Sequence, residues 1–126
     1  MFATVLQVAL GGAMGASLRY LAGVGVVRLV GMGTFPLGVI TVNILGSFLM
    51  GVFVTIAANR GLTHLSPLLM TGFLGGFTTF SSFSLEAVTL YERGDMSAAV
   101  LYVVASVVCS IFGLLLGLWL ARGMFA

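Results

Sequence analysis

Four long apolar stretches, separated by short polar breaks, take up almost the whole chain. They cover residues 4–27, 36–58, 66–91 and 96–121. Each exceeds the roughly 20 apolar residues that a helix needs to cross the hydrocarbon core of a bilayer. The sequence therefore predicts one all-α membrane domain, residues 1–126, with four transmembrane helices.

The charge content excludes most soluble functions. Only 6% of the residues are charged and 60% are hydrophobic, whereas about a quarter of the residues in a soluble domain are charged. The net charge of +2 comes from five basic residues against three acidic ones, which is too sparse for binding nucleic acid. We therefore expect the lipid bilayer to be the solvent of this chain.

The arginines fall almost evenly on the two faces of the predicted bundle. With four crossings, both termini share one face with Arg60 and Arg122, while Arg28 and Arg93 lie on the other, with Arg19 if it belongs to the second half of the first helix. Because basic residues set orientation, this balance predicts insertion both ways up. Dual topology permits an antiparallel homodimer with its two-fold axis in the membrane plane. The alternative is a weak bias that selects one orientation.

The third stretch contains a run that is unfavourable for a helix. Gly75 and Gly76 are followed by Thr78 and Thr79, which are poor helix formers. The run predicts a break at 75–79. Unpaired carbonyls at membrane depth survive only inside protein or around water or an ion, and a pair of such breaks across a two-fold axis would form a symmetric site for a small cation. The alternative is a glycine hinge that nearby hydroxyls satisfy.

Polar side chains recur at helical spacing in two further stretches. Tyr102, Ser106 and Ser110 are spaced by four residues, so they share one helix face and form a ladder of donors that an anion could follow. Asn43 lies in the middle of the second stretch, with Ser47 one turn on. A buried amide in lipid needs partners; the alternative for Asn43 is a hydrogen bond between helices.

The third stretch also carries rings and an acid on one face. Phe80 and Phe83 are three residues apart, and aromatic rings present a positive edge to an anion; simple packing is the alternative. Glu86 lies one turn on and is the only acid within a span, which makes it a functional candidate or an interfacial carboxylate. Arg19 either reaches the interface or supplies positive potential at an anion entrance.

Glycines at four-residue spacing favour close helix contacts in lipid. No catalytic motif accompanies them, because the single histidine, His64, falls in a predicted loop without a nearby acid. We therefore expect no enzyme. The glycine pairs are Gly11 with Gly15, Gly72 with Gly76, and Gly113 with Gly117.

Taken together, these segments resemble the Fluc family of fluoride channels, also called CrcB. The matching runs are GGAMGASLRY at 11–20, PLG at 36–38 with VNILG at 42–46, and GFLGGFTTFSSFSLE at 72–86. The resemblance implies passive fluoride export across the plasma (inner) membrane by an antiparallel homodimer with two pores. It also implies a structural Na⁺ at the dimer interface, bound by the backbone carbonyls of Gly75 and Thr78.

The resemblance assigns roles to individual positions. It implies pore-lining rings at Phe80 and Phe83 and a pore amide at Asn43. Two departures from the family stand out: Ser82 replaces a common Thr, and Val39 replaces a Thr that commonly follows Gly38. The remaining implied positions are a polar track of Tyr102, Ser106 and Ser110, a pore border of Ser81, Ser82 and Glu86, and a vestibule residue, Arg19.

Two other functions compete with a fluoride channel. A small dual-topology cation/proton antiporter could use Glu86, but that class needs a membrane-embedded acid, typically in its first helix, where this chain has only Arg19. A structural subunit without transport activity is the second alternative. The in-line hydroxyls of the fourth stretch argue against it.

Overall fold

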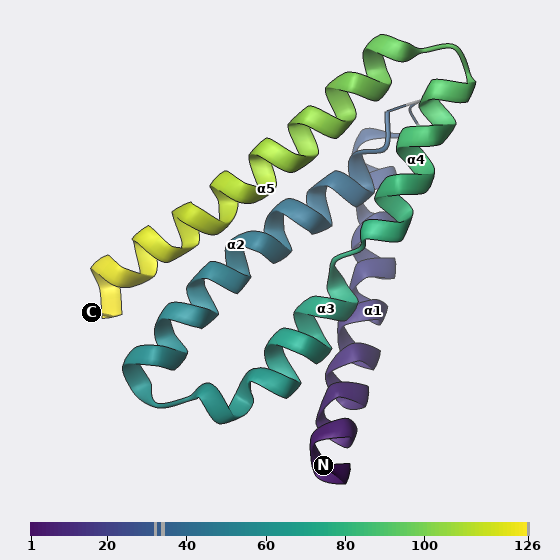
Figure 1. Cartoon of the computed structure of the whole chain (residues 1–126). Helices are drawn as coiled ribbons and strands as arrows, with labels where there is room; N and C mark the ends of the chain where they lie inside the picture. The colour runs from purple at the N-terminus through teal and green to yellow at the C-terminus, as the bar shows by residue number, and fades with distance from the viewer. Residues whose placement is uncertain (32, 34, 126) are drawn as a thin grey trace.

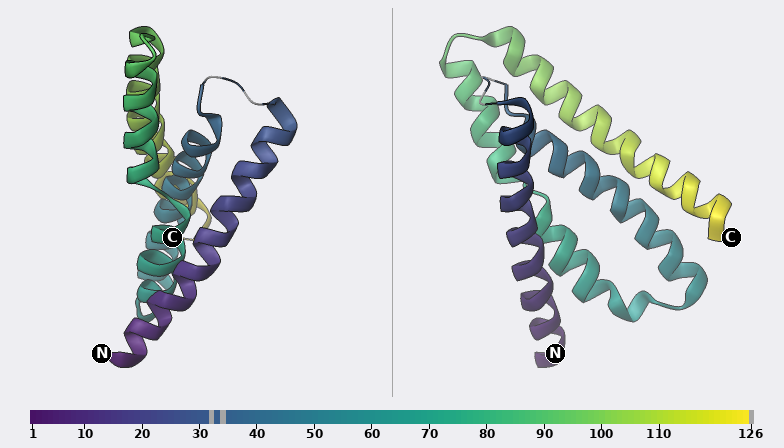
Figure 2. Two further views of the ribbon diagram at one scale, coloured as in Figure 1. Left: turned by 90° about the vertical axis from the view of Figure 1, so that its right-hand side faces the viewer. Right: turned by 180° about the vertical axis from the view of Figure 1, so that it is seen from behind.

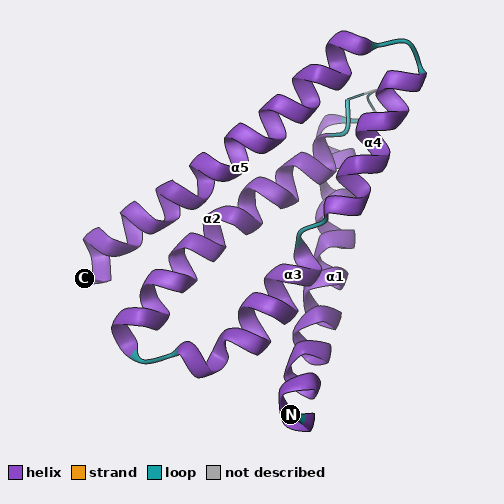
Figure 3. Ribbon diagram, in the orientation of Figure 1, coloured by secondary structure: helices purple, strands orange, loops and turns teal. Residues whose placement is uncertain are grey.

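The computed structural model describes residues 1–31, 33 and 35–125, and these residues form helices joined by short turns. Met32 and Thr34, which lie between the first and second predicted stretches, are outside the described residues. Figure 1 and Figure 3 show the order of the elements. They are α1 (Phe2–Val30), α2 (Leu37–Arg60), a 3₁₀ turn η1 (Thr63–Leu65), a π-helical segment η2 (Pro67–Leu74), α3 (Gly75–Phe77), α4 (Phe80–Glu92) and α5 (Met96–Phe125).

Within the described residues, four helical spans are long and apolar enough to cross a membrane. They are Phe2–Val30, Leu37–Arg60, Thr63–Glu92 and Met96–Met124. The four predicted transmembrane helices are therefore confirmed, each within a few residues of its expected bounds. The third span is assembled from η1, η2, α3 and α4 and bends where α3 meets α4.

The spans pack as two pairs, and within each pair the two spans run parallel to each other. α1 packs against η2 and α3, and α2 packs against α5 (Figure 1). α4 leaves α1 and packs against the first half of α5. The connections after α1 and after α4 lie at one end of the bundle, and both termini point toward the other (Figure 2).

Glycine allows α1 to touch the main chain of the third span. A Cβ added to Gly72 would lie 3.0 Å from the Cα of Gly11, and one added to Gly76 would lie 2.7 Å from the carbonyl oxygen of Gly12. Gly15 stands one turn on and also meets the main chain of this span. The close contact predicted from the glycine spacing is confirmed, and it brings α3 against the middle of α1.

α2 and α5 meet in the same way. A Cβ added to Gly113 would lie 3.3 Å from the carbonyl oxygen of Ile44, and Gly117 and Gly51 each stand directly against main chain of the partner helix. Small residues therefore set the spacing of both helix pairs.

The break in the third span is confirmed, but it is narrower than predicted. Gly75 keeps a helical backbone (φ −62°, ψ −38°), and α3 continues to Phe77. Thr78 (φ −87°, ψ 162°) and Thr79 (φ −152°, ψ 122°) are extended, and α4 begins at Phe80. The two glycines stay helical because α3 lies against α1, so their low helix propensity is outweighed by packing.

Candidate functional site

The Asn43 side chain, in the first third of α2, is hydrogen-bonded to the main chain of the break. Its Nδ2 donates to the carbonyl oxygen of Thr79 at 2.9 Å, and its Oδ1 accepts from the Thr79 N–H at 2.8 Å. The amide side chain therefore replaces both partners that the extended residue loses by leaving the helix. The sequence left two roles open for Asn43, a pore amide or a hydrogen bond between helices. These two contacts are the hydrogen bond between separate spans.

Thr79 also caps the N-terminus of α4. Its Oγ1 accepts from the Ser82 N–H at 3.1 Å, and the Ser81 hydroxyl lies 3.4 Å from the same oxygen. The N–H groups of the first helical turn have no carbonyl partner inside a helix. The positive end of α4 is therefore directed at the break, which lies in the middle of the third span.

The carbonyl groups at the break differ in their surroundings. The hydroxyl and the N–H of Thr78 both donate to the Leu74 carbonyl, at 2.9 Å and 3.0 Å. The Ser82 N–H is bound to the Thr79 side chain, so the Thr78 carbonyl stands outside the hydrogen-bond ladder of α4. Gly75 lies on an exposed face of α3. The carbonyls of Gly75 and Thr78, which were expected to bind a cation, thus lie at the C-terminal end of the short helix α3, at membrane depth.

A groove of about 370 Å³ opens on one side of the break, between α2, α4 and α5. Five of the ten predicted pore residues meet here, from three separate spans: Asn43, Phe80, Phe83, Ser106 and Ser110. The groove is lined by Asn43, Ser47, Thr78, Thr79, Phe80, Phe83, Ser106 and Ser110, together with apolar residues of α2 and α5.

The two phenylalanines of α4 stand differently in the groove. Their ring centroids lie 5.4 Å apart, but Phe83 is 8% exposed whereas Phe80 is 77% exposed. The ring of Phe83 packs on that of Tyr102, with centroids 5.3 Å apart. Tyr102 in turn packs edge to face on Phe35, with centroids 5.6 Å apart and an interplanar angle of 87°. A ladder of rings therefore runs from the groove into the core between α4 and α5.

Three polar atoms are buried without a hydrogen-bond partner among the described residues. They are the hydroxyls of Ser106 and Tyr102 and Oε2 of Glu86. Ser106 is 4% exposed and Tyr102 is 0% exposed. A buried polar group without a partner costs free energy, and native structures rarely keep one without a reason. All three atoms belong to residues that the sequence had singled out.

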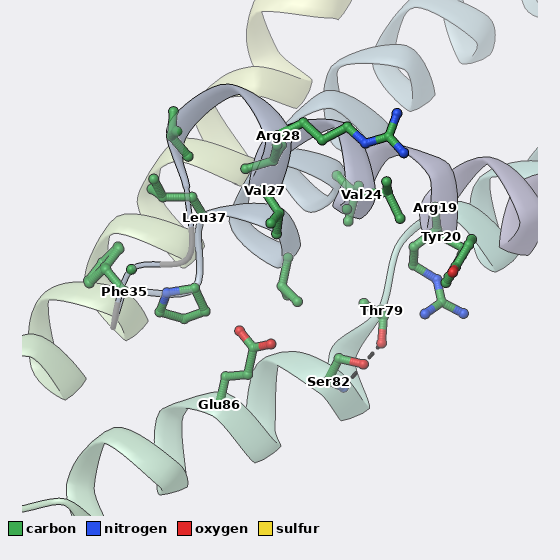
Figure 4. Close-up of a pocket in the computed structure, with 18 of the residues that line it drawn as sticks. Arg19, Tyr20, Val24, Val27, Arg28, Phe35, Leu37, Thr79, Ser82 and Glu86 are labelled. Atoms are coloured by element: carbon green, nitrogen blue, oxygen red, sulfur yellow. Dashed lines mark hydrogen bonds between the residues drawn. The ribbon is translucent and has the colours of Figure 1, made fainter.

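A second hollow, the cleft, lies on the opposite side of the break. It measures about 620 Å³ and lies between the second half of α1, residues 35–39 and α4. Figure 4 shows the Glu86 carboxylate pointing into it, with the Arg19 side chain on the side of Thr79 and Ser82. Thr79 lines both hollows, so the groove and the cleft meet at the break.

Arg19 has a defined partner in this cleft. Its Nε donates to the carbonyl oxygen of Gly76 at 3.0 Å. The Arg19 side chain therefore contacts the main chain of α3 through its Nε.

Residues 6–118 match a family described as "CrcB-like protein, Camphor Resistance (CrcB)". The chain belongs to the CrcB family. It is similar along its whole length to curated CrcB relatives named "Fluoride-specific ion channel FluC". The relative from Ruegeria sp. (strain TM1040) is 64% identical over 124 residues, which cover 98% of each chain. The relative from Cereibacter sphaeroides (strain ATCC 17029 / ATH 2.4.9) is 56% identical over 126 residues, all of both chains.

Three features of this CrcB site were missed by sequence reasoning. The π-helical turn at 67–74 has no recognised signal in the sequence. The contact between Arg19 and Gly76 joins positions 57 residues apart, which spacing cannot reveal. The Thr79 cap did have a signal, because Thr is among the residues preferred at the N-cap of a helix.

Proposed function

We propose that this chain is a fluoride channel, which lets fluoride leave the cell down its gradient as an antiparallel homodimer with two pores. One observation carries the proposal: the unpartnered buried hydroxyl of Ser106, the Ser110 hydroxyl and the Asn43 amide line one groove beside the positive end of α4 at bilayer depth. Curated CrcB relatives named as fluoride-specific channels, 64% and 56% identical over nearly the whole chain, support the choice of ion.

The groove offers fluoride a substitute for its water shell. The hydroxyls of Ser106 and Ser110 can donate to the ion, and the edges of the Phe80 and Phe83 rings carry positive partial charge. An amide nitrogen has two N–H donors, so Asn43 can brace the break with one and offer the other. Tyr102, Ser81, Ser82, Glu86 and Arg19 lie beside this path or toward the cleft.

The groove lacks a fixed positive charge among the described residues that line it. Conduction requires binding that is strong enough to admit an ion and weak enough to release it. Neutral donors meet this requirement better than a buried arginine, whose attraction would be large at low dielectric. The donor set therefore suits passage of fluoride better than its storage.

A second, inverted copy of the chain would complete the groove. Phe80 is exposed and lies at the open side of the groove, and Gly75 is exposed on α3. The nearly equal numbers of arginines on the two faces favour insertion in both orientations. In such a two-fold symmetric dimer, both copies use the same surface, so one self-complementary face of the chain is enough.

The break carbonyls fit the structural Na⁺ that the resemblance implies. Main-chain oxygens at an interrupted transmembrane helix are suitable sodium ligands. The Thr78 carbonyl stands outside the α4 ladder, and Gly75 is on the exposed face of α3. Two inverted copies would supply four such oxygens, and a bound Na⁺ would hold the two helix stubs together across the axis.

The test is fluoride efflux from liposomes that contain the purified protein, followed with a fluoride electrode. We expect efflux from protein-containing liposomes and none from empty ones. Phe80→Ile and Phe83→Ile should each lower efflux by about fivefold or more, since each removes a ring edge worth about 1 kcal/mol or more, while crosslinking still detects the dimer.

Three outcomes would contradict the proposal. The absence of any anion leak would favour a structural subunit. Proton-coupled cation exchange that Glu86→Gln abolishes would favour the antiporter. Full efflux in both phenylalanine variants would remove the role of the ring edges.

A further inference from the structure

Arg19 continues the glycine face of α1. Gly11, Gly15 and Arg19 are spaced by four residues, so they share one face of the helix. The two glycines stand directly against the main chain of the third span. One turn later, where α3 ends, the face changes from the smallest residue to one with a long donor side chain.

The partner of Arg19 is a carbonyl that the helix cannot satisfy. Gly76 belongs to α3, which ends at Phe77. In a continuous helix the Gly76 carbonyl would accept from the N–H of Phe80, but Phe80 opens α4 beyond two extended residues. The last carbonyls of a helix carry its negative end, and the Arg19 Nε donates to this one at 3.0 Å.

Gly76 lies too close to α1 to carry a side chain of its own. A Cβ on Gly76 would lie 2.7 Å from the carbonyl oxygen of Gly12 and 3.2 Å from the nitrogen of Ala16. The donor comes from α1, along the same face that makes the close contact. Arg19 is the residue of α1 that supplies it.

We propose that Arg19 is a positioning residue whose Nε–H caps the C-terminal end of α3 and holds the break in place. Asn43 braces the break from α2 at Thr79, and Arg19 braces it from α1 at Gly76. Together the two side chains fix the carbonyls of Gly75 and Thr78 on either side. The link to transport rests on the proposed function, but the cap itself does not.

The cap and an entrance charge make different demands on the residue at position 19. Glutamine places its amide nitrogen on Cδ, where arginine carries Nε, and has no charge. Lysine keeps the charge but has no nitrogen on Cδ. A cap predicts that Arg19→Gln is tolerated and Arg19→Lys is not, whereas an entrance charge predicts the reverse.

The first measurement is fluoride efflux from liposomes. We expect Arg19→Gln to stay within about threefold of the wild-type rate, and Arg19→Lys and Arg19→Met to fall by about tenfold or more, because a hydrogen bond to a buried carbonyl is lost. Arg93→Gln is the matched control, since Arg93 is exposed just after α4 and is not among the residues that line the groove or the cleft. It should change efflux by less than about twofold, and only at low ionic strength.

The second measurement is hydrogen exchange of the peptide that covers residues 75–80. The N–H of Thr78, bound to the Leu74 carbonyl, should exchange faster in the lysine and methionine variants and at the wild-type rate in Arg19→Gln. This measurement needs no transport. If the wild-type protein moves no fluoride, the proposed function fails, and exchange alone decides the cap.

The glutamine and lysine variants together give a clear decision. Wild-type-like behaviour of Arg19→Gln with a loss in Arg19→Lys supports the cap. The opposite pattern overturns it in favour of an entrance charge. Equal behaviour of the two variants, whether both keep or both lose the wild-type property, also overturns the cap, because the donor at Nε would then not decide the outcome. Where efflux and hydrogen exchange disagree, hydrogen exchange decides.

Discussion

The two sides of the break are built from different chemistry. The groove is lined by an amide, hydroxyls and aromatic rings, and no charged residue stands among the described residues that line it. The cleft on the other side holds Arg19, Arg28 and Glu86. Thr79 belongs to both, so the two environments meet at the break.

This difference indicates where the chain tolerates charge. A charge deep in a membrane protein is costly and also binds a counter-ion strongly. In the cleft, Arg28 is exposed near the end of α1 and Arg19 is already bound to the Gly76 carbonyl. In the groove, neutral donors stand ready without holding an ion permanently. The groove therefore keeps neutral donors, whereas the charges of the cleft lie either near the end of α1, as Arg28 does, or against main chain, as Arg19 does.

The largest expected effect comes from removing the brace that separates the two sides. Asn43→Leu keeps the volume of the side chain but leaves the N–H and the carbonyl of Thr79 without partners. Each unpaired group costs about 1–3 kcal/mol, so we expect fluoride efflux to fall by about a hundredfold or more. The control is Thr55→Val, because the Thr55 hydroxyl donates to the Gly51 carbonyl of its own helix and Thr55 is not among the groove residues. It should have a small effect. Efflux near the wild-type rate in Asn43→Leu would contradict the brace.

A smaller effect, with opposite signs for two properties, is expected from Ser106→Ala. The Ser106 hydroxyl is buried and has no partner among the described residues, so its removal should raise the free energy of unfolding by about 1–3 kcal/mol. Loss of the same donor should lower efflux by about tenfold, because an ion in the groove loses one hydrogen bond.

The control for Ser106 is a hydroxyl already satisfied by its own helix. The Thr89 hydroxyl donates to the Leu85 carbonyl at 2.7 Å, so Thr89→Val should leave efflux unchanged. Thermal unfolding in detergent and liposome efflux measure the two properties of each variant. A Ser106→Ala protein that is less stable and equally active would show that the hydroxyl serves packing alone.

Much of this arrangement could be predicted from the sequence, because a helix that crosses a lipid bilayer needs a long apolar run that is easy to recognise. The four spans follow from length and apolarity, and the glycine spacing identified both close helix contacts. The hydroxyl spacing in the fourth span and the run at Thr78 and Thr79 identified residues at the break, since Ser106 and Ser110 line the groove there. Tyr102, the third member of the predicted hydroxyl face, packs on Phe83 instead.

The rest depended on contacts between distant parts of the chain. Propensity alone placed Gly75 in the break, but packing against α1 keeps it helical. The partners of Asn43 and Arg19 lie 36 and 57 residues away, and spacing within one helix says nothing about them. Local pattern therefore predicted which residues matter, whereas tertiary packing decided which atoms they bind.

The smallest expected effect tests how far the donor path extends toward the cleft. Tyr102→Phe removes a buried hydroxyl that has no partner among the described residues and keeps the ring that packs on Phe83 and Phe35. We expect a stability gain of about 1 kcal/mol from the loss of an unsatisfied group and a fall in efflux of about threefold. A fall as large as that of Ser106→Ala would place the path through Tyr102 itself. Unchanged efflux with raised stability would confine the path to the groove, so the same pair of measurements decides where the neutral donors end and the charged side begins.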